Sequence, residues 1–280
     1  MKRVASIQDI SCLGRCSLTV ALPVISAMEV ECAILPTAVL SAHTMFPDIL
    51  CRDLTADILP IARYWQSQQV RLDAVYTGYL ASPRQVEDVC QALEVLAGPD
   101  TLRFVDPAMA DGGALYTGFD EDFPRHMARL AAQADVVTPN LTEACLLTGT
   151  PYREDYDLPQ LRDILRKLAE LGPRHVVLTG VPYGPDKLGV LAYTPAEERF
   201  FEYGSRRIDA HFPGTGGLFS SSWRASPRPS RNDGGLRRWK HWASRWRRPC
   251  VWRWISRCCA SKSPAGMKTP HGTGWSLKKH

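Results

Sequence analysis

The chain has 280 residues, of which 45% are hydrophobic and 22% charged, and its formal net charge is +5. This length fits one large α/β domain. No apolar stretch is long enough to span a bilayer, and no secretory apolar region follows the N-terminus, which argues against a membrane-spanning or secreted protein. The nine cysteines form no C-x-x-C pair, so we expect a reducing, cytoplasmic location.

Strand-like apolar runs alternate with helical periodicities over the first 210 residues. In chain order, the predicted elements are strand Val4–Ile10, helix Ser17–Met28, strand Glu31–Val39, helix Thr55–Gln69, strand Ala74–Thr77, helix Pro83–Leu96, strand Leu102–Val105, helix Phe123–Gln133, strand Asp135–Thr138, a short helix at Thr142–Leu147, helix Leu158–Leu171, strand His175–Thr179, and an antiparallel pair formed by Leu188–Tyr193 and Arg199–Tyr203. Strands separated by helices predict right-handed β-α-β units.

The predicted fold class is therefore α/β, a three-layer α/β/α arrangement around a central, mostly parallel sheet. Ligands of such sheets bind where the carboxyl ends of the strands meet their loops. Polar groups follow nearly every predicted strand, at Gln8-Asp9, His43-Thr44, Gly78-Tyr79, Asp106, Asn140 and Thr179-Gly180. This placement is typical of nucleotide-dependent enzymes.

The composition changes abruptly near residue 217. Residues 217–280 hold 15 of the 34 Lys and Arg residues, seven of the eight tryptophans and a single acidic residue, Asp233. The preceding part carries 19 basic and 28 acidic side chains. One evolved domain rarely changes so sharply. We therefore predict a globular domain over residues 1–221 and a separate basic tail over residues 222–280.

A glycine-rich turn, Gly214-Thr215-Gly216, follows His211-Phe212-Pro213. Successive backbone N–H groups of such a turn can point into one concavity, and a helix starting after it would complete an anion site for a phosphate. The alternative is an ordinary turn. The run lacks the Gly-Lys-Ser/Thr of a Walker loop.

Two further segments place acids at strand ends. Asn140 and Glu143, within the run Thr138–Ala144, can reach one Mg²⁺-phosphate cluster directly or through water. Their alternative is a helix start, with Asn140 or Thr142 as the N-cap and Glu143 in the first turn. Asp106, before Pro107, is placed to face the ligand site, and its alternative is a turn opener.

Taken together, seven motifs between residues 2 and 220 resemble the pyridoxal/pyridoxamine (vitamin B6) kinases of the ribokinase superfamily. They are Ser6–Ser11, Gly14–Thr19, Leu35–Thr44, Tyr76–Leu80, Asp106–Met109, Thr138–Ala144 and Phe212–Gly216. The resemblance implies transfer of the γ-phosphate of ATP, with Mg²⁺, to the 5′-hydroxymethyl group of pyridoxal, pyridoxamine or pyridoxine. It also implies a homodimer, and neither a membrane nor a specific nucleic acid as partner.

The resemblance assigns roles to individual positions. For the vitamin it implies Asp9, where many relatives have a serine at the pyridine ring, together with His43, Thr44 and Tyr79. For ATP it implies Asp106, Thr138, Asn140, Glu143 and Thr179, of which Asp106 and Glu143 lie near the metal. For the phosphate anion hole it implies Gly214, Thr215 and Gly216.

Position 217 departs from the family pattern. The family loop reads Gly-Thr-Gly-Asp, and that aspartate is the catalytic base, whereas this chain has Gly217. A glycine has no side chain to accept the proton of the substrate alcohol. The loss of a general base typically slows a reaction by about 10²- to 10⁴-fold, so we expect impaired activity.

The tail also departs from the family, which continues with apolar helices. From Trp223 onward this sequence is rich in Arg, Trp, Ser, Pro and Gly and has few aliphatic residues, a composition typical of a GC-rich gene read out of frame. We hypothesise a frameshift shortly after Ser221 and expect an unstructured tail. Its charge and tryptophans can also suit RNA, single-stranded DNA or an anionic membrane, but no nucleic-acid module is present.

Two alternative functions stay open from the sequence. One is a hydroxymethylpyrimidine kinase of thiamine synthesis, a relative with the same phosphate loop. The other is a catalytically dead paralogue that binds nucleotide or pyridoxal without turnover, which Gly217 favours.

Overall fold

The computed structural model describes residues 1–44 and 46–206. In chain order their elements are β1 (Arg3–Ser11), α1 (Leu18–Ala27), β2 (Glu31–Leu40), β3 (Cys51–Asp53), α2 (Thr55–Ser67), β4 (Ala74–Thr77), α3 (Pro83–Leu96), β5 (Leu102–Val105), β6 (Ala110–Asp111), β7 (Ala114–Leu115), α4 (Phe123–Ala132), β8 (Val136–Val137), α5 (Leu141–Thr148), α6 (Leu158–Glu170), β9 (His175–Gly184), β10 (Lys187–Thr194), the 3₁₀ turn Pro195–Glu197 and β11 (Arg199–Arg206). The predicted tail, residues 222–280, lies outside the described residues.

Nine of these strands form one sheet, in the order β11-β10-β9-β8-β5-β4-β1-β2-β3. The six strands from β9 to β2 are parallel, and the antiparallel strands lie at the edges, with β3 beside β2 and β10-β11 beside β9. The predicted α/β class and the antiparallel pair are confirmed. The sequence did not indicate β3 or the small hairpin β6-β7, and it placed the ends of β1 and β9 too early.

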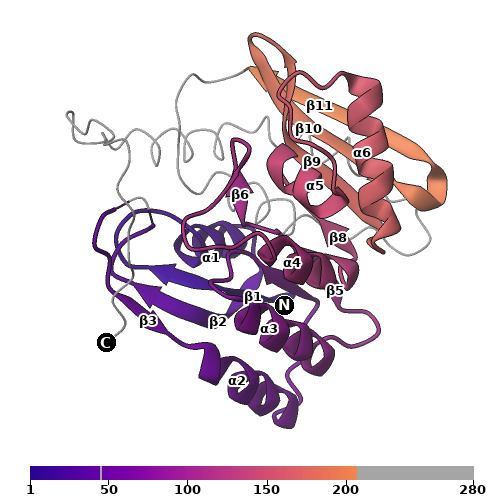
Figure 1. Ribbon diagram of the computed structural model, residues 1–280. Coiled ribbons are helices and arrows are strands. Elements are labelled where there is room, and N and C mark those ends of the chain that lie inside the picture. Colours follow the sequence, from indigo (N-terminus) through magenta and orange to yellow (C-terminus); the bar gives the residue numbers. More distant parts are fainter. Residues whose placement is uncertain (45, 207–280) are drawn as a thin grey trace. The chain divides into compact units, whose positions relative to one another are not determined.

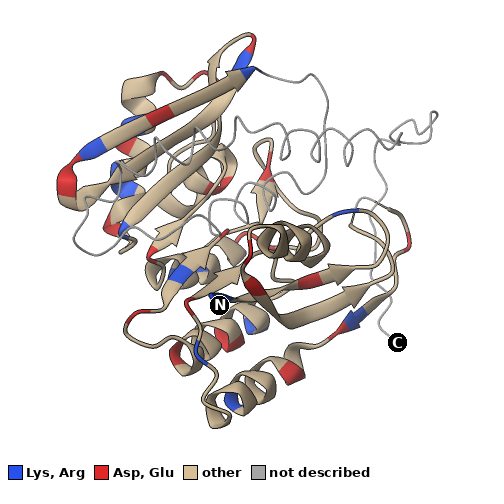
Figure 2. Cartoon of the chain, turned by 180° about the vertical axis from the view of Figure 1, so that it is seen from behind, with Lys and Arg blue, Asp and Glu red and all other residues tan. Residues whose placement is uncertain are grey.

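Helices cover both faces of the sheet. On one face, α2 to α6 pack as successive neighbours, while α1 lies on the other face against β1 and β2 (Figures 1 and 2). Helix α6 is an example of how such a helix packs on the sheet. Its buried residues Leu161, Ile164, Leu165 and Leu168 recur at helical spacing and so form one apolar face. Among the described α-helices, α1 alone lies on that second face.

The core under α2 to α6 is built from alternate strand residues. Ile7, Val75 and Val105 belong to this cluster and are fully buried. Because side chains alternate along a strand, their neighbours Tyr76 and Phe104 point to the other face, where they are also fully buried and pack edge to face at 5.5 Å.

A bulge interrupts the pairing of β1 with β2. Gln8 pairs with Pro36 and Ile10 with Val39, so Thr37 and Ala38 together stand opposite the single residue Asp9. Such a bulge leaves one backbone position outside the ladder. The carbonyl of Thr37 is turned away and accepts a hydrogen bond from the backbone N–H of Leu54 at 3.0 Å.

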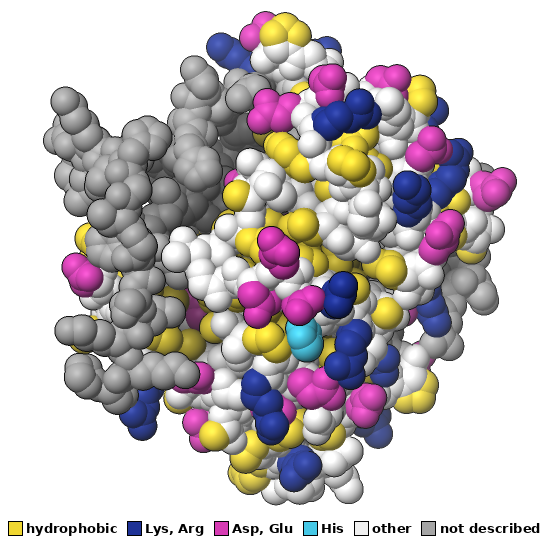
Figure 3. Space-filling view, in the orientation of Figure 1, with side chains coloured by type: hydrophobic (Ala, Val, Ile, Leu, Met, Phe, Trp, Pro, Cys, Tyr) yellow, Lys and Arg dark blue, Asp and Glu magenta, His cyan; other side chains and the backbone are white. Residues whose placement is uncertain are grey.

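The face of α2 to α6 carries both signs of charge in close alternation (Figure 3). Ion pairs such as Arg129–Glu87 at 2.9 Å and Arg166–Asp163 at 2.6 Å occupy this surface. On this view, the described residues form no basic patch of the kind that tracks a nucleic acid. Within the described ranges, no helix combines the length and the apolar character needed to cross a bilayer.

Candidate active site

The predicted site residues lie at one edge of the sheet, because all the strands that carry them are parallel. His43 and Thr44 follow β2, Tyr79 follows β4 and Asp106 follows β5. Asp9 and Thr179 lie inside β1 and β9, within the predicted strand bounds Val4–Ile10 and His175–Thr179 and not in the loops that follow them. Strand β9 continues to Gly184 because its backbone still pairs with β10.

Asp9 is a buried carboxylate near the carboxyl end of β1. Its side chain is 2% exposed, and the Ser11 hydroxyl donates to Oδ2 at 3.0 Å. The other carboxylate oxygen, Oδ1, is buried and has no hydrogen-bond partner among the described residues that satisfies both distance and angle. Desolvation raises the pKa of Asp9, although hydrogen bonds from Ser17 and Ser11 oppose this. A buried acid with an unused oxygen is suited to a polar ligand.

Tyr79 shares this environment. Burial, and then the charges of Asp9 and Cys51, raise its pKa to about 12, so the phenol stays protonated at neutral pH. Its ring lies 5.6 Å from that of Phe119, which stacks on Phe123. Asp9 is therefore near enough to Tyr79 to act on it electrostatically, and the two residues offer a polar group and an aromatic surface.

His43 is held against the loop that follows β1. Its backbone N–H donates to the carbonyl of Leu13 at 3.0 Å, and its ring lies so close to Gly14 that a Cβ at that position would sit 2.1 Å from the ring carbon Cδ2. Burial lowers the pKa of His43. The neighbouring Thr44 is exposed.

The two predicted metal-side acids form a close like-charge pair. Glu143 is 3% exposed, and desolvation followed by the charge of Asp106 raises its pKa well above the ordinary value. Asp106, directly after β5, is 8% exposed. Two carboxylates in this arrangement repel each other unless a proton or a cation lies between or beside them.

Asn140 and Glu143 also form a capping box at the start of α5. Asn140 Oδ1 accepts from the N–H of Glu143 at 2.9 Å, and Glu143 Oε2 accepts from the N–H of Asn140 at 2.8 Å. The other oxygen of Glu143 accepts from the N–H of Met109 at 3.2 Å. The helix-start alternative is thus confirmed, with Asn140 as the N-cap.

Thr138 directly follows β8, and Thr179 lies within the neighbouring strand β9. Thr138 is 2% exposed, and its N–H donates to the carbonyl of Val105 at 3.0 Å. The N–H and the hydroxyl of Thr179 both donate to the carbonyl of Pro139, at 2.9 and 3.3 Å. These bonds join the loop after β8 to β9.

Cys16 connects the two halves of the site. Its thiol has a pKa raised by burial, and the charges of Asp9 and Asp106 both contribute to that rise. Asp9 and Asp106, which the sequence assigns to the vitamin and to the metal, therefore both act electrostatically on one side chain. Cys16 belongs to the motif Gly14–Thr19, but the sequence assigned it no role, because its nearness to Asp106 joins segments 90 residues apart.

The sequence also missed the hairpin β6-β7 and Tyr116. The carbonyl of Ala110 accepts from Asn140 Nδ2 at 2.7 Å, and the N–H of Gly113 donates to the Thr142 hydroxyl at 3.0 Å. Burial and the charge of Glu143 raise the pKa of Tyr116. The dipeptide Gly112-Gly113 was the available signal, since two glycines with positive φ are typical of the two-residue turns of tight hairpins.

The donor set fits a magnesium ion held partly by water. Within the described residues, no three His, Cys, Asp or Glu side chains gather as a metal cluster. Mg²⁺ needs only one or two protein carboxylates and keeps several waters. Asp106 fits as the contact to such a hydrated ion, while both oxygens of Glu143 already accept backbone N–H groups. The predicted anion hole, Gly214, Thr215 and Gly216 with Gly217, lies outside the described residues.

Several known proteins are similar in sequence to this chain. The model of the family described as phosphomethylpyrimidine kinase matches residues 23–227, so the match ends close to where the composition changes. A pyridoxine/pyridoxal/pyridoxamine kinase of Bordetella avium is 30% identical over 237 residues, which cover 79% of this chain and 76% of that protein. A hydroxymethylpyrimidine/phosphomethylpyrimidine kinase of Streptomyces coelicolor is 32% identical over 55% of this chain and 54% of its own length.

The matched length differs among relatives. A pyridoxal kinase of Pasteurella multocida is 32% identical over 111 residues, which cover 38% of this chain and 37% of that protein. This chain therefore spans well under two thirds of several curated relatives that it matches.

Solved structures share the fold over most of the chain. A Bacteroides thetaiotaomicron protein assigned as a phosphomethylpyrimidine kinase, in an orthorhombic form with pyridoxal, has a TM-score of 0.77 and 41% identity over 80% of this chain and 79% of that one. Pyridoxal kinase from Lactobacillus plantarum has a TM-score of 0.77 and 32% identity over 92% of this chain and 90% of that one. The chain therefore belongs to the phosphomethylpyrimidine kinase family of the ribokinase superfamily, and its fold is that of the pyridoxal kinases.

Proposed function

We propose that this protein is an ATP-dependent pyridoxal/pyridoxamine kinase, which phosphorylates the 5′-hydroxymethyl group of vitamin B6. The proposal depends on one observation, that a pair of residues suited to a pyridine ring lies near a pair of acidic residues. Asp9 and Tyr79 offer a polar group and an aromatic surface for a pyridine ring, and Asp106 and Glu143 concentrate negative charge. Cys16 lies near both Asp9 and Asp106. The pyridoxal-bound Bacteroides relative supports this choice of substrate.

Each of these residues has a proposed role in binding or in phosphoryl transfer. The unused Oδ1 of Asp9 would accept a hydrogen bond from the substrate ring and orient it, with His43 and Thr44 at its rim. Asp106, Thr138, Asn140, Glu143 and Thr179 would surround the nucleotide. Bound Mg²⁺ would neutralise charge on the phosphates, as in other phosphoryl-transfer enzymes. The backbone N–H groups of Gly214, Thr215 and Gly216 would hold the transferred phosphoryl group.

Position 217 sets the expected rate. As the substrate oxygen bonds to the γ-phosphorus and the bond to ADP breaks, the hydroxyl proton must leave. Gly217 offers no acceptor, so the proton must pass to water. We therefore propose slow turnover by this chain, in a homodimer like that implied by the family resemblance.

The experiment compares the full chain with its Gly217→Asp variant. Each is incubated with ATP, Mg²⁺ and either pyridoxal, pyridoxamine, pyridoxine or hydroxymethylpyrimidine, and the phosphorylated product is measured by mass spectrometry. We expect vitamin B6 products, formed about 10²- to 10⁴-fold faster by Gly217→Asp. If neither protein binds or phosphorylates a B6 vitamer, the proposal fails.

The same assay separates the two alternatives. A hydroxymethylpyrimidine kinase is favoured by the Streptomyces coelicolor match, and it would phosphorylate hydroxymethylpyrimidine in preference to every B6 vitamer. A non-catalytic paralogue, favoured by Gly217, would bind ATP or pyridoxal while both proteins form no product.

A further inference from the structure

Gln85, in the first turn of α3, joins three segments that surround the vitamin side of the site. Its side chain is 1% exposed. Its amide oxygen accepts from the backbone N–H of Ala81 at 2.9 Å, and its amide nitrogen donates to the carbonyl of Thr37 at 3.0 Å. Because these two partners are a backbone donor and a backbone acceptor, the orientation of the amide is fixed.

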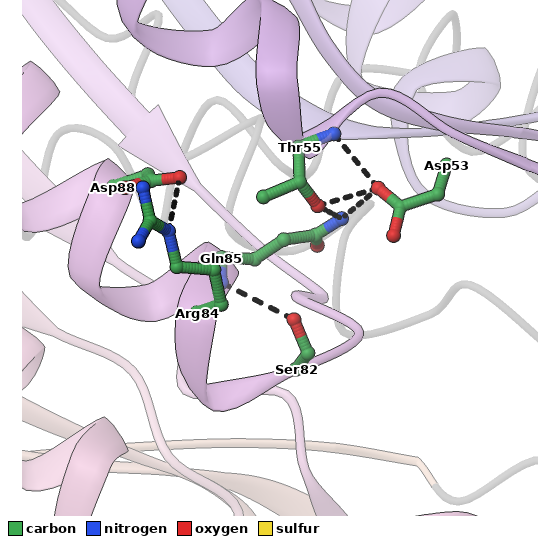
Figure 4. A network of polar contacts seen from close by, with 6 residues as sticks. All are labelled: Asp53, Thr55, Ser82, Arg84, Gln85 and Asp88. Carbon is green, nitrogen blue, oxygen red and sulfur yellow. Dashed lines mark hydrogen bonds and ion pairs between the residues drawn. The ribbon is translucent and has the colours of Figure 1, made fainter.

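The amide nitrogen also reaches the start of α2. It lies 3.0 Å from the Thr55 hydroxyl and 3.3 Å from Asp53 Oδ1, and the N–H of Thr55 donates to the same Asp53 oxygen at 2.7 Å. Figure 4 shows the side chains of Asp53, Thr55 and Gln85 converging between α2 and α3. One buried amide thus bonds to β2, to the β3-α2 junction and to the loop after β4.

Each of these segments leads to a predicted vitamin-binding residue. Strands β2 and β3 are the two ends of the loop that carries His43 and Thr44. Ala81 is two residues from Tyr79, and the intervening Leu80 is fully buried. A shift of the Gln85 amide would therefore be transmitted to both loops together.

The partner of Gln85 in β2 lies in the bulge. Thr37 stands opposite Asp9, and its carbonyl faces the side of β2 on which β3 pairs. Gln85 and the N–H of Leu54 satisfy it, each at 3.0 Å. Without the Gln85 amide this carbonyl would keep the N–H of Leu54 and lose the second of its two hydrogen bonds, which costs free energy.

We propose that Gln85 is a positioning residue, which sets the distance between the loop bearing His43 and Thr44 and the loop bearing Tyr79. The expected effect of Gln85 on pyridoxal binding rests on the function proposed above, whereas its expected effect on the two loops does not depend on that function. The residue touches neither substrate nor nucleotide, and it acts through the backbone of Thr37 and Ala81.

The test uses the full chain and three variants. Gln85→Met keeps the side-chain length and removes the amide, and Thr55→Val removes the hydroxyl that accepts from Gln85 and donates to Asp53. The matched control is Thr101→Val, because the Thr101 hydroxyl donates to the carbonyl of Leu72 at 2.8 Å and accepts from the N–H of Gly98 at 3.1 Å. These bonds tie the amino ends of β4 and β5, at the sheet edge away from the site.

Hydrogen–deuterium exchange gives the readout that needs no ligand. We expect Gln85→Met to speed exchange about tenfold in both residues 41–50 and residues 78–81, and Thr55→Val to do so less strongly. Thr101→Val should leave both loops unchanged. Unchanged exchange in Gln85→Met, or equal acceleration by Thr101→Val, would overturn the proposal. If Gln85→Met does not fold, Thr55→Val decides by the same criterion.

Binding measurements then separate this inference from the proposed function. We expect Gln85→Met to raise the Kd of pyridoxal about tenfold and to leave the Kd of ATP unchanged, which a general loss of stability would not do. Equal weakening of both ligands would contradict a positioning role. Absence of pyridoxal binding by the unaltered chain would refute the function instead, while the exchange experiment would still test Gln85.

Discussion

At the residue scale, the contact of His43 with Gly14 makes a glycine essential for the site. Gly14 has a φ of +83°, and an added Cβ would lie 2.1 Å from Cδ2 of His43. Left-handed backbone costs a non-glycine residue about 1–2 kcal/mol, and overpacking adds about 1–3 kcal/mol. The ring must therefore move if the position carries any side chain.

We expect Gly14→Ala to lower the unfolding temperature and to weaken pyridoxal binding. Gly112→Ala is the matched control, because Gly112 also has a positive φ, +57°, but has nothing within 4 Å of the added Cβ. Both variants carry the backbone strain, and only Gly14→Ala displaces His43. Thermal unfolding and pyridoxal titration test this, and equal binding by the two variants would contradict it.

Asp9 gives a pH-dependent prediction. Burial raises its pKa in the folded protein, so the folded state binds the proton more tightly than the unfolded chain. Stability therefore falls as pH rises through this window. The burial penalty is absent below the ordinary carboxyl value of about 4 and fully present above the folded-state pKa.

We expect Asp9→Asn to unfold at a higher temperature than the unaltered chain at pH 7.5, and this gain to vanish toward pH 4. The same variant should bind pyridoxal more weakly. Asp186→Asn, at an exposed position, controls for the loss of one negative charge. A gain that does not depend on pH would show that Asp9 bears no burial penalty.

At the element scale, the start of α5 combines two tasks. Asn140 and Glu143 cap the helix, and the same residues are proposed to lie near the nucleotide. Helix α6 starts with an equivalent capping box, formed by Asp157 and Gln160, on a helix that carries no predicted site residue. The two helix starts therefore separate structural from functional effects.

We expect Asn140→Ala and Asp157→Ala each to destabilise the fold by about 1 kcal/mol or more through cap loss. Asn140→Ala should cost more, since it also loses the bond to the Ala110 carbonyl. Only Asn140→Ala should weaken ATP binding. Denaturant unfolding and nucleotide titration measure both effects, and unchanged ATP affinity in Asn140→Ala would refute the nucleotide role.

The helices and strands differ in how far the sequence predicts them. The long strands and helices were predicted because hydrophobic periodicity extends over many residues. Strands β6 and β7 have two residues each, which is too short for a period. The capping box was foreseen as an alternative from the spacing of Asn140 and Glu143. The nearness of Cys16 to both Asp9 and Asp106 depends on tertiary packing, and no local pattern encodes it.

At the scale of the whole molecule, the family resemblance implies apolar helices after the phosphate loop that bury one face of the sheet's end. Residues 217–280 contain only five Leu, Ile and Val residues among 64. Such a segment has little aliphatic surface with which to bury an apolar sheet.

We expect a chimera with the C-terminal segment of the Bordetella avium kinase in place of residues 222–280 to unfold at a higher temperature than this chain. Gly217 is kept in the chimera, so that stability and catalysis are changed separately. Resequencing the gene tests the frameshift hypothesis independently. A chimera no more stable than the natural chain would show that the tail already meets the need of the sheet.

The bulge in β2 also constrains the length of the chain. Thr37 and Ala38 share one partner position, so deleting either residue would restore a regular ladder. A regular ladder would keep the pairs Ile10–Val39 and Ser11–Leu40 on their present faces, but it would remove one of the two residues that stand opposite Asp9, beside the Thr37 carbonyl that accepts from Gln85. No predicted site residue lies in the turn between β9 and β10. We therefore infer that insertions and deletions are tolerated there and forbidden at residues 37–38, although both segments belong to the same sheet.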